Sequence, residues 1–172
     1  MHVLFVCTGN ICRSPAAERL AAAYACQHQI QGFTASSAGT RAVIDHPIHP
    51  NAARALESYG GDSSGFAARQ LTLRIAGTAD LVIAMTRAHR DAVLDIAPRQ
   101  LHRTFTLSQA SLLATKWNAQ NVSELATLRP HLATSELQDI PDPIGEGTEF
   151  FAEVVGQIAN LLPPVIELCR PR

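Results

Sequence analysis

Short apolar runs alternate along the chain with longer stretches in which apolar residues recur at helical spacing. The runs predict buried strands over residues 2–7 and 80–85, and we expect two further strands over residues 33–37 and 103–107. The amphipathic stretches predict helices over residues 15–29, 50–59 and 87–96, and a further helix after Thr148. Strands that alternate with helices are typical of an α/β fold, in which helices flank a parallel sheet on both faces.

The last third of the chain gives a weaker signal. Residues 108–137 carry scattered leucines and Trp117, which suggest two short helices that lie as a lid over the sheet, with the tryptophan in a packing role. The helix after Thr148 carries one apolar stripe, formed by Phe150, Val154, Ile158 and Leu161. Pro163 and Pro164 are expected to break or kink this helix, because proline lacks the N–H that a helix interior requires.

The composition is that of an ordinary globular chain and limits what the protein can bind. Its 172 residues are 47% hydrophobic and 17% charged, with a formal net charge of −1, which fits one domain over residues 1–172. There is no basic excess for nucleic-acid binding, no apolar stretch of the ~20 residues that cross a membrane, and no basic region of a signal peptide. Four cysteines are too few for a disulfide framework. We therefore expect a cytoplasmic protein without nucleic-acid or membrane partners; the composition does not indicate an oligomeric state.

The loop after the first predicted strand has the features of an anion site. Residues 7–14 read Cys-Thr-Gly-Asn-Ile-Cys-Arg-Ser, and Ser14 is a plausible N-cap for a helix that Pro15 opens. Loop amides and the helix macrodipole together attract anions at such a junction, and Gly9 permits close approach of the backbone. We expect a phosphate-binding loop composed of Thr8, Gly9, Asn10, Ile11, Cys12, Arg13 and Ser14.

Two side chains add reactive chemistry to this loop. Thiols at a helix N-terminus beside an arginine ionise readily, with pKa values lowered from about 8.5 into the ~3.5–7.5 range, so Cys7 is the candidate nucleophile. Arg13 offers a planar fork that matches two phosphate oxygens. Ser14 can donate a hydrogen bond to the Cys7 sulfur and stabilise it as thiolate and as leaving group. The alternative, a buried cysteine beside a surface arginine, leaves the intervening glycine, asparagine and serine unexplained.

Phosphoryl transfer through a phosphocysteine needs a general acid, and a single carboxyl can later act as the base that activates water. The segment Asp139-Ile-Pro-Asp142-Pro offers two candidates. The prolines that flank Asp142 would hold it on a stiff, extended loop, whereas Asp139 could instead serve a turn. Spacing alone leaves the choice between the two open.

Further motifs occur in the order found in a known family. The loop is followed by Ser37-Ala-Gly-Thr, Ala68-Arg-Gln-Leu, Ala79-Asp-Leu-Val with Met85, and a late Asp142-Pro. Over about residues 1–162 the chain resembles the low-molecular-weight protein tyrosine phosphatases. The resemblance implies a four-stranded parallel sheet flanked by helices, and hydrolysis of phosphotyrosine in a phosphorylated protein substrate.

The resemblance also implies roles for individual residues. Cys7 becomes the nucleophile, Arg13 the phosphate clamp and Asp142, in preference to Asp139, the general acid. The loop asparagine, Asn10, is implied to bond Ser37 and hold the shape of the loop, so Asn10, Ser14 and Ser37 are expected as loop supports. Cys12 matches a second loop cysteine that can form a reversible disulfide with the nucleophile, which would make the enzyme redox-sensitive.

The departures from the family pattern concern the substrate more than the chemistry. Phe66 stands where relatives often carry a histidine that supports the loop. Ile144 follows Asp-Pro where many relatives carry an aromatic residue, and residues 41–46 replace an aromatic or large apolar wall opposite. Val43, Ile44 and Ile144 still supply apolar surface, so phosphotyrosine remains the expected substrate.

Three alternative functions share these features. Protein-arginine phosphatases resemble this loop but carry threonine at the position of Ile11. Thioredoxin-coupled arsenate reductase needs two further cysteines in the middle of the chain, and residues 27–168 contain none, while the loop of a thiol-cofactor-coupled arsenate reductase looks different. A catalytically silent phosphate-binding module has no need for Cys7, Arg13 and Asp142 together.

Neither a metal nor a cofactor is expected. Asp45, His46 and His49 suggest a metal site, but prolines interrupt them and no helix would align the imidazoles, so exposed loop histidines are the better interpretation. Cys26 is expected in the core of the first helix, and Cys169 has no evident role.

Overall fold

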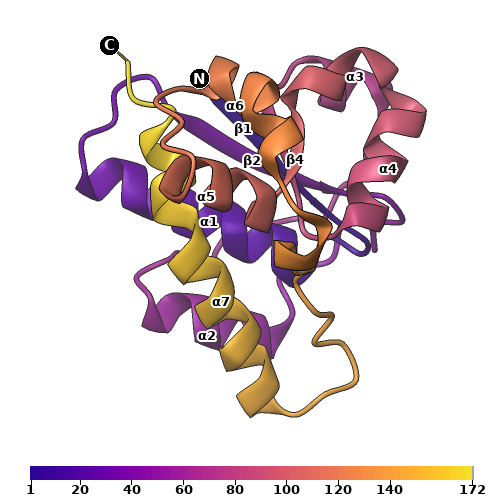
Figure 1. Ribbon diagram of the computed structural model, residues 1–172. Helices are drawn as coiled ribbons and strands as arrows, with labels where there is room; N and C mark the ends of the chain where they lie inside the picture. The colour runs from indigo at the N-terminus through magenta and orange to yellow at the C-terminus, as the bar shows by residue number, and fades with distance from the viewer. Residues whose placement is uncertain (172) are drawn as a thin grey trace.

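Four parallel strands form the central sheet of the computed structural model, which describes residues 1–171 (Figure 1). The strands lie in the spatial order β2-β1-β3-β4. Their bounds are β1 His2–Cys7, β2 Thr34–Gly39, β3 Leu81–Ala84 and β4 Thr104–Thr106. The predicted α/β fold is therefore confirmed, and the strands differ from the predicted ones only at their ends.

The central strand β1 is buried on both faces because its side chains alternate between two apolar clusters. Val3 and Phe5 belong to one cluster, and Leu4 and Val6 belong to the other. All four side chains are fully buried. Cys7, the last residue of β1, lies at the carboxyl edge of the sheet.

Helices cover both faces of the sheet (Figure 1). The first cluster is closed by α1 Arg13–Gln27, α2 Pro50–Ser58, α5 Leu107–Thr115 and α7 Thr148–Glu167. The second cluster lies under α3 Leu73–Gly77 and α4 Arg87–Ile96. The remaining elements are α6 Val122–Leu128 and the 3₁₀ turns η1 Pro98–Arg103, η2 Arg129–His131 and η3 Thr134–Glu136. Within residues 1–171, no helix is both long and apolar enough to span a membrane.

The helix α7 continues past Pro163 and Pro164, so the predicted break is wrong. The backbone carbonyls of residues 159 and 160 lose their helical N–H donors, but both residues are at least partly exposed and water can replace the bond. Beyond the prolines, Val165 and Ile166 are fully buried. The burial of these two side chains favours an uninterrupted helix.

The apolar stripe of α7 differs from the predicted one at its ends. Val154 is buried in the middle of the helix, as predicted. Phe151 and Leu162 are also buried, whereas Phe150 and Leu161 are only partly covered. The helix therefore presents a slightly rotated face to the core.

The two short helices predicted within residues 108–137 are α5 and α6, although α5 begins one residue earlier. α5 packs on β3, β4 and α7, and α6 packs on α5 and η1. Trp117 follows α5 and stacks on His131 with a ring-centroid distance of 4.7 Å. The tryptophan therefore has the expected packing role.

The helix α1 begins at Arg13, two residues before the predicted start. Cys12 occupies the N-cap position without a side-chain cap bond, so the prediction of Ser14 as the N-cap is wrong. The Ser14 hydroxyl contacts the Cys7 sulfur and the loop instead. Cys26, near the end of this helix, is exposed rather than part of the core, whereas Cys169 is buried.

Candidate active site

The loop of residues 7–14 lies where the connections of the sheet diverge. β1 is flanked by β2 on one side and β3 on the other, and the chain leaves β1 towards β2. In open parallel sheets, ligands bind beyond the carboxyl ends of the strands at such a point. The loop connects the buried strand β1 to the first turn of α1, and Cys7 and Arg13 are 2% and 5% exposed.

The backbone of the loop is arranged for an anion. The N–H groups of residues 9–14 donate to no acceptor among the described residues. The N-terminus of α1 has no side-chain cap and no acidic residue in its first turn. Unpaired backbone donors at a helix N-terminus, together with the helix dipole, make a site for a phosphate-like anion.

Asn10 holds the loop in a conformation that few residues adopt. Its φ angle is 57°, in the left-handed region that asparagine tolerates better than most residues. The Asn10 Nδ2 donates to the hydroxyls of Ser14 and Ser37 over 2.9 and 2.8 Å, and its Oδ1 accepts from the Arg69 N–H over 2.9 Å. These bonds tie the loop to α1, to β2 and to the segment that follows α2.

The hydrogen-bond network continues to a carboxylate that the sequence pattern did not indicate. The Ser37 hydroxyl donates to Glu18 Oε2 over 2.6 Å. Glu18 also lies 3.4 Å from Arg19 Nε, and the Arg19 guanidinium lies 5.6 Å from the centre of the Phe66 ring. A carboxylate on α1 therefore anchors the network, and Phe66 packs beside it.

The direction of the bond between Ser14 and Cys7 follows from its neighbours. The Ser14 Oγ lies 3.0 Å from the Cys7 sulfur, and both atoms are buried. Because Asn10 donates to the same Ser14 oxygen, the Ser14 hydroxyl hydrogen is available to donate to sulfur. A hydrogen bond to the ionised form of a thiol favours that form.

Arg13 makes two contacts with the loop that carries the two candidate acids. Its Nη2 lies 2.8 Å from Asp142 Oδ2, and its Nη1 donates to the Ile140 carbonyl over 3.0 Å. The Asp142 side chain is half exposed, while that of Arg13 is almost completely buried. The Ile144 N–H donates to the other Asp142 oxygen over 3.2 Å, which fixes the carboxylate at the mouth of the site.

Asp139 has different partners. Its carboxylate accepts from the Arg87 backbone N–H over 2.8 Å and lies 3.4 Å from Arg87 Nε. Arg87 is the first residue of α4, so Asp139 ties its loop to the start of that helix. This contact agrees with the turn-like structural role that the sequence left open for Asp139.

A cavity of about 260 Å³ brings these groups together. Its floor is formed by the loop, and Asp142 stands at its edge. Three apolar side chains, Ile11, Val43 and Ile144, line it together with Arg41. Val43 and Ile144 are 38% and 50% exposed, so the cavity opens to solvent between two apolar side chains.

Residues 40–43, which include Arg41, form one wall of the cavity, and backbone hydrogen bonds attach this wall to the loop that forms the floor. The N–H groups of Thr40, Arg41 and Val43 donate to the carbonyls of residues 7, 8 and 9, respectively, over 2.9–3.0 Å. Gly39 is needed for this close approach, because a Cβ there would lie 2.5 Å from the Thr8 carbonyl oxygen. The wall and the floor therefore move as one unit.

Comparison with known proteins assigns this arrangement to a family. Residues 2–110, more than half of the chain, match the family described as low molecular weight phosphotyrosine protein phosphatase. The chain belongs to this phosphatase family. Etp, a low molecular weight protein-tyrosine-phosphatase of Escherichia coli K12, is 31% identical over 156 residues, which cover 91% of this chain and 86% of Etp.

Two solved structures have similar folds. The low molecular weight protein tyrosine phosphatase of T. tengcongensis superposes with a TM-score of 0.78 at 29% identity, covering 97% of this chain and 98% of the other. The YwlE arginine phosphatase, in a cysteine-to-serine mutant with a phosphorylated active-site serine, has a TM-score of 0.78 at 26% identity, covering 97% and 94%. Both a tyrosine and an arginine phosphatase therefore share the architecture of this phosphatase.

The second loop cysteine of the phosphatase, Cys12, is buried, as Cys7 is. Burial, followed by the proximity of Cys7 and Asp142, raises the pKa of Cys12 to about 12, against a smaller lowering by Arg13. Cys12 is therefore a neutral thiol at physiological pH. It is close to Cys7 in the same cavity but is not an ionised nucleophile.

His89 is a buried residue beside the loop that the sequence pattern missed. Its Nε2 lies 2.8 Å from the Thr8 Oγ1. The available signal was its position, five residues after the end of the strand β3, since the carboxyl ends of parallel strands share one edge. A single histidine in an amphipathic helix gives no other indication of its role.

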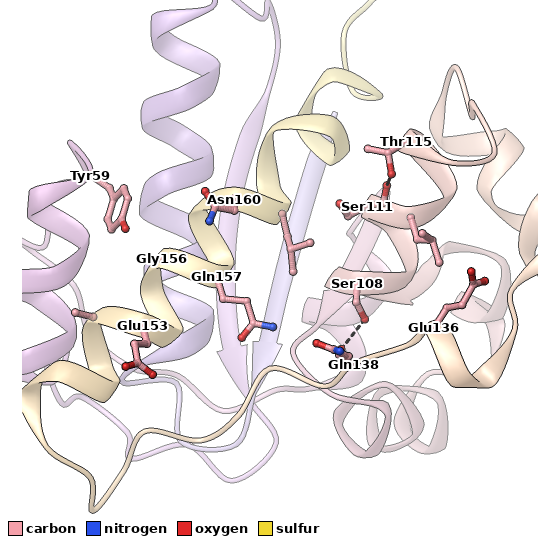
Figure 2. Close-up of a pocket in the computed structure, with 13 residues that line it drawn as sticks. Tyr59, Ser108, Ser111, Thr115, Glu136, Gln138, Glu153, Gly156, Gln157 and Asn160 are labelled. Carbon is pink, nitrogen blue, oxygen red and sulfur yellow. Dashed lines mark hydrogen bonds between the residues drawn. The ribbon is translucent and has the colours of Figure 1, made fainter.

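A larger cavity of about 620 Å³ lies away from the loop, beside α5 and α7 (Figure 2). Uncharged polar side chains such as Ser111, Gln157 and Asn160 line much of it. Ser108 is occupied there by a 2.7 Å hydrogen bond to the Gln138 carbonyl. The cavity holds neither a cysteine nor an arginine, so its lining does not supply the chemistry of the loop.

The histidines near residue 46 have separate environments. His49 accepts a hydrogen bond from the Asn51 N–H over 3.2 Å and so caps α2, and its ring stacks on Phe151 at 4.6 Å. His46 is exposed. Across the described residues, no three histidine, cysteine, aspartate or glutamate side chains are grouped so that they could hold a metal ion.

Proposed function

We propose that this phosphatase hydrolyses phosphotyrosine in proteins through a phosphocysteine intermediate formed on Cys7. The observation that carries the proposal is the shared cavity, in which the Cys7 sulfur, the Arg13 guanidinium and the Asp142 carboxylate surround unpaired backbone N–H groups. A thiolate nucleophile, a dianion site and a carboxyl at the exit are what phosphoryl transfer from an ester requires.

In the first step, the Cys7 thiolate attacks phosphorus and the bond to the tyrosine oxygen breaks. Arg13 and the N–H groups of residues 9–14 hold the three non-bridging oxygens, where negative charge is concentrated. Protonated Asp142 gives its proton to the departing tyrosine oxygen. This step requires that the ion pair between Arg13 and Asp142 opens when the phosphate binds.

In the second step, the Asp142 carboxylate takes a proton from a water molecule, and the oxygen of that water attacks the phosphocysteine. Phosphate leaves and the Cys7 thiolate is regenerated, stabilised by the Ser14 hydroxyl. The phosphorylated active-site serine of the YwlE mutant supports a covalent intermediate at the corresponding step in that relative.

The walls of the cavity support phosphotyrosine as the substrate. Ile11, Val43 and Ile144 form apolar surfaces against which a phenyl ring can pack. Arg41 places a positive charge on the same lining, and this charge would repel the guanidinium group of a phosphoarginine. Ile11 also stands where the resemblance places threonine in arginine phosphatases.

The test uses three peptides of one sequence that carry phosphotyrosine, phosphoarginine or phosphoserine. We expect kcat/KM for phosphotyrosine to exceed the other two by at least ~10-fold, since the loss of apolar contact typically costs that much. Cys7→Ser should abolish turnover, and Arg13→Lys should lower kcat by about 100-fold or more, because lysine cannot make the bidentate contact.

Each alternative function predicts a different result, in this assay or in a parallel assay with arsenate or inorganic phosphate. A preference for phosphoarginine would assign the chain to the arginine phosphatases. Thiol-dependent reduction of arsenate would make it a reductase. Binding of inorganic phosphate without hydrolysis of any peptide would make it a silent phosphate-binding module.

We further propose a cytoplasmic location, reversible redox control and a single folding unit. A reactive Cys7 beside the neutral Cys12 is best kept in a reducing compartment. Oxidation of Cys7 by peroxide gives a sulfenic acid; attack by Cys12, with loss of its proton, then forms the disulfide and releases water.

Both apolar clusters share one sheet, which supports a single domain over residues 1–172.

A further inference from the structure

His89 lies beside the loop, at the carboxyl edge of the sheet. It occupies the first turn of α4, where its backbone N–H is capped by the Thr86 hydroxyl over 3.1 Å. The strand β3 that leads to α4 pairs directly with β1, the strand that ends at Cys7. The topology therefore places the first turn of α4 against the start of the loop.

The side chain of His89 makes one hydrogen bond, and its partner belongs to the loop. Its Nε2 lies 2.8 Å from the Thr8 Oγ1. The residue is 7% exposed, and its Nδ1 is buried with no partner among the described residues. A buried N–H without an acceptor is rarer than an unused lone pair, so we assign the proton to Nε2, which donates to Thr8.

His89 is uncharged at physiological pH. Burial first, and then the nearby Arg13, lower its pKa to about 4, against weaker opposite effects of Asp142 and Asp139. The imidazole therefore adds no charge to the site near neutral pH. Any contribution to the reaction must come from where it holds its partner.

Thr8 is held from two sides. His89 binds its hydroxyl, and the Arg41 N–H donates to its carbonyl over 3.0 Å. The carbonyl of Thr8 and the N–H of Gly9 belong to one planar peptide, so the direction of the first fixes the direction of the second. The Gly9 N–H is one of the unpaired donors of the loop.

We propose that His89 is a positioning residue of the phosphate loop, which acts through the Thr8 hydroxyl to aim the first loop amide at the bound oxyanion. The proposal rests on the proposed function only in that the loop is taken to hold the phosphate. It assigns a second element of the fold, the first turn of α4, to oxyanion binding. Sequence spacing within the loop could not indicate this contact.

The experiment compares Thr8→Val, His89→Leu, the double variant and His89→Gln. For each, the affinity for inorganic phosphate is measured as protection of Cys7 from iodoacetate, together with kcat and KM on a small aryl phosphate. Gln100→Leu is the matched control: Gln100 is also 7% exposed and makes a buried 3.0 Å bond to the Ala76 carbonyl, away from the loop. Thermal unfolding of every variant separates loss of stability from loss of binding.

We expect Thr8→Val and His89→Leu each to weaken phosphate binding by about 2- to 10-fold, the range for one positioning hydrogen bond. The double variant should lose no more than either single variant, because both remove the same contact. His89→Gln keeps an N–H donor at similar reach and should recover most of the affinity. Gln100→Leu should lower the unfolding temperature without changing phosphate binding.

Wild-type phosphate affinity in Thr8→Val, or additive losses in the double variant, would overturn the proposal. An equal loss of phosphate affinity in Gln100→Leu would show that the effect is general destabilisation, and would also overturn the proposal. If His89→Leu does not fold, Thr8→Val and His89→Gln decide the question. A wild-type protein that neither hydrolyses the aryl phosphate nor is protected by phosphate would instead refute the proposed function.

Discussion

Replacing Asp142 with asparagine keeps the size of the side chain but removes the proton that the leaving group needs. For an alkyl-substituted phenyl phosphate, whose leaving oxygen is strongly basic, kcat should fall by roughly 10²–10⁴. For an activated aryl phosphate, whose leaving oxygen scarcely needs a proton, the fall should be much smaller. The signature of the acid is therefore a change in the dependence of kcat on the basicity of the leaving group.

The ion pair between Arg13 and Asp142 predicts a second, opposite effect. The carboxylate lies 2.8 Å from the guanidinium and competes with phosphate for it. Because the Asp142 side chain is 50% exposed, the pair is worth about 0.2–1 kcal/mol rather than the value of a buried one. Asp142→Asn should therefore bind inorganic phosphate about 1.4- to 5-fold more tightly while turning over more slowly.

Asp139→Asn is the matched control, since Asp139 lies on the same loop but bonds the start of α4. It should lower stability slightly and leave the leaving-group dependence unchanged. The assay is steady-state kcat over a series of substituted phenyl phosphates, with phosphate as a competitive inhibitor. If Asp139→Asn steepens the dependence and Asp142→Asn does not, the assignment of the acid is wrong.

Three further predictions concern other contacts of the site. Ser14→Ala removes the 3.0 Å contact with the Cys7 sulfur. A hydrogen bond to an ionised group is worth about 1.5–3 kcal/mol, so kcat on a small aryl phosphate should fall by about 10- to 150-fold; an unchanged kcat would contradict the assigned direction of that bond. After mild peroxide and then a dithiol, the wild type should regain activity and Cys12→Ser should not; equal recovery, or no Cys7–Cys12 disulfide by mass spectrometry, would leave Cys12 a packing residue. His89 has a pKa of about 4 when folded and 6.5 as the reference value, so the unfolded chain binds its proton first and stability is lost as the pH falls between these values. Urea unfolding at several pH values gives the slope of the free energy of unfolding against pH. In His89→Gln this slope should be smaller than in the wild type by close to one proton, and an unchanged slope would assign the loss of stability to another group.

The sequence was sufficient to predict those features whose signal lies within one short segment of the chain. Apolar runs predicted the two central strands, β1 and β3, because a strand buried on both faces must be continuously apolar. The spacing within residues 7–14 indicated a nucleophile and a clamp, because the loop that joins them is short. Spacing alone could not separate Asp142 from Asp139, and the resemblance was needed to do so.

The missed features depend on contacts between distant segments. Glu18 receives the Ser37 hydroxyl, and His89 contacts Thr8, only because the sheet order brings their elements together. The start of α1 was misplaced because the Ser14 hydroxyl turns to sulfur rather than to the helix backbone. The predicted break at the prolines of α7 is absent for a related reason: tertiary burial outweighs a local preference against helix.

The attachment of the cavity wall to the loop has an evolutionary consequence. Backbone atoms make the three bonds between residues 40–43 and residues 7–9, so these bonds do not depend on which side chains the wall carries. Val43, on the cavity lining, and its neighbour Ile44 are 38% and 57% exposed, and mutation can exchange such residues without disturbing the catalytic floor. Selection can therefore alter which phosphorylated side chain is accepted while the bond-breaking apparatus stays constant. That separation offers a physical route to new substrate preferences on one scaffold.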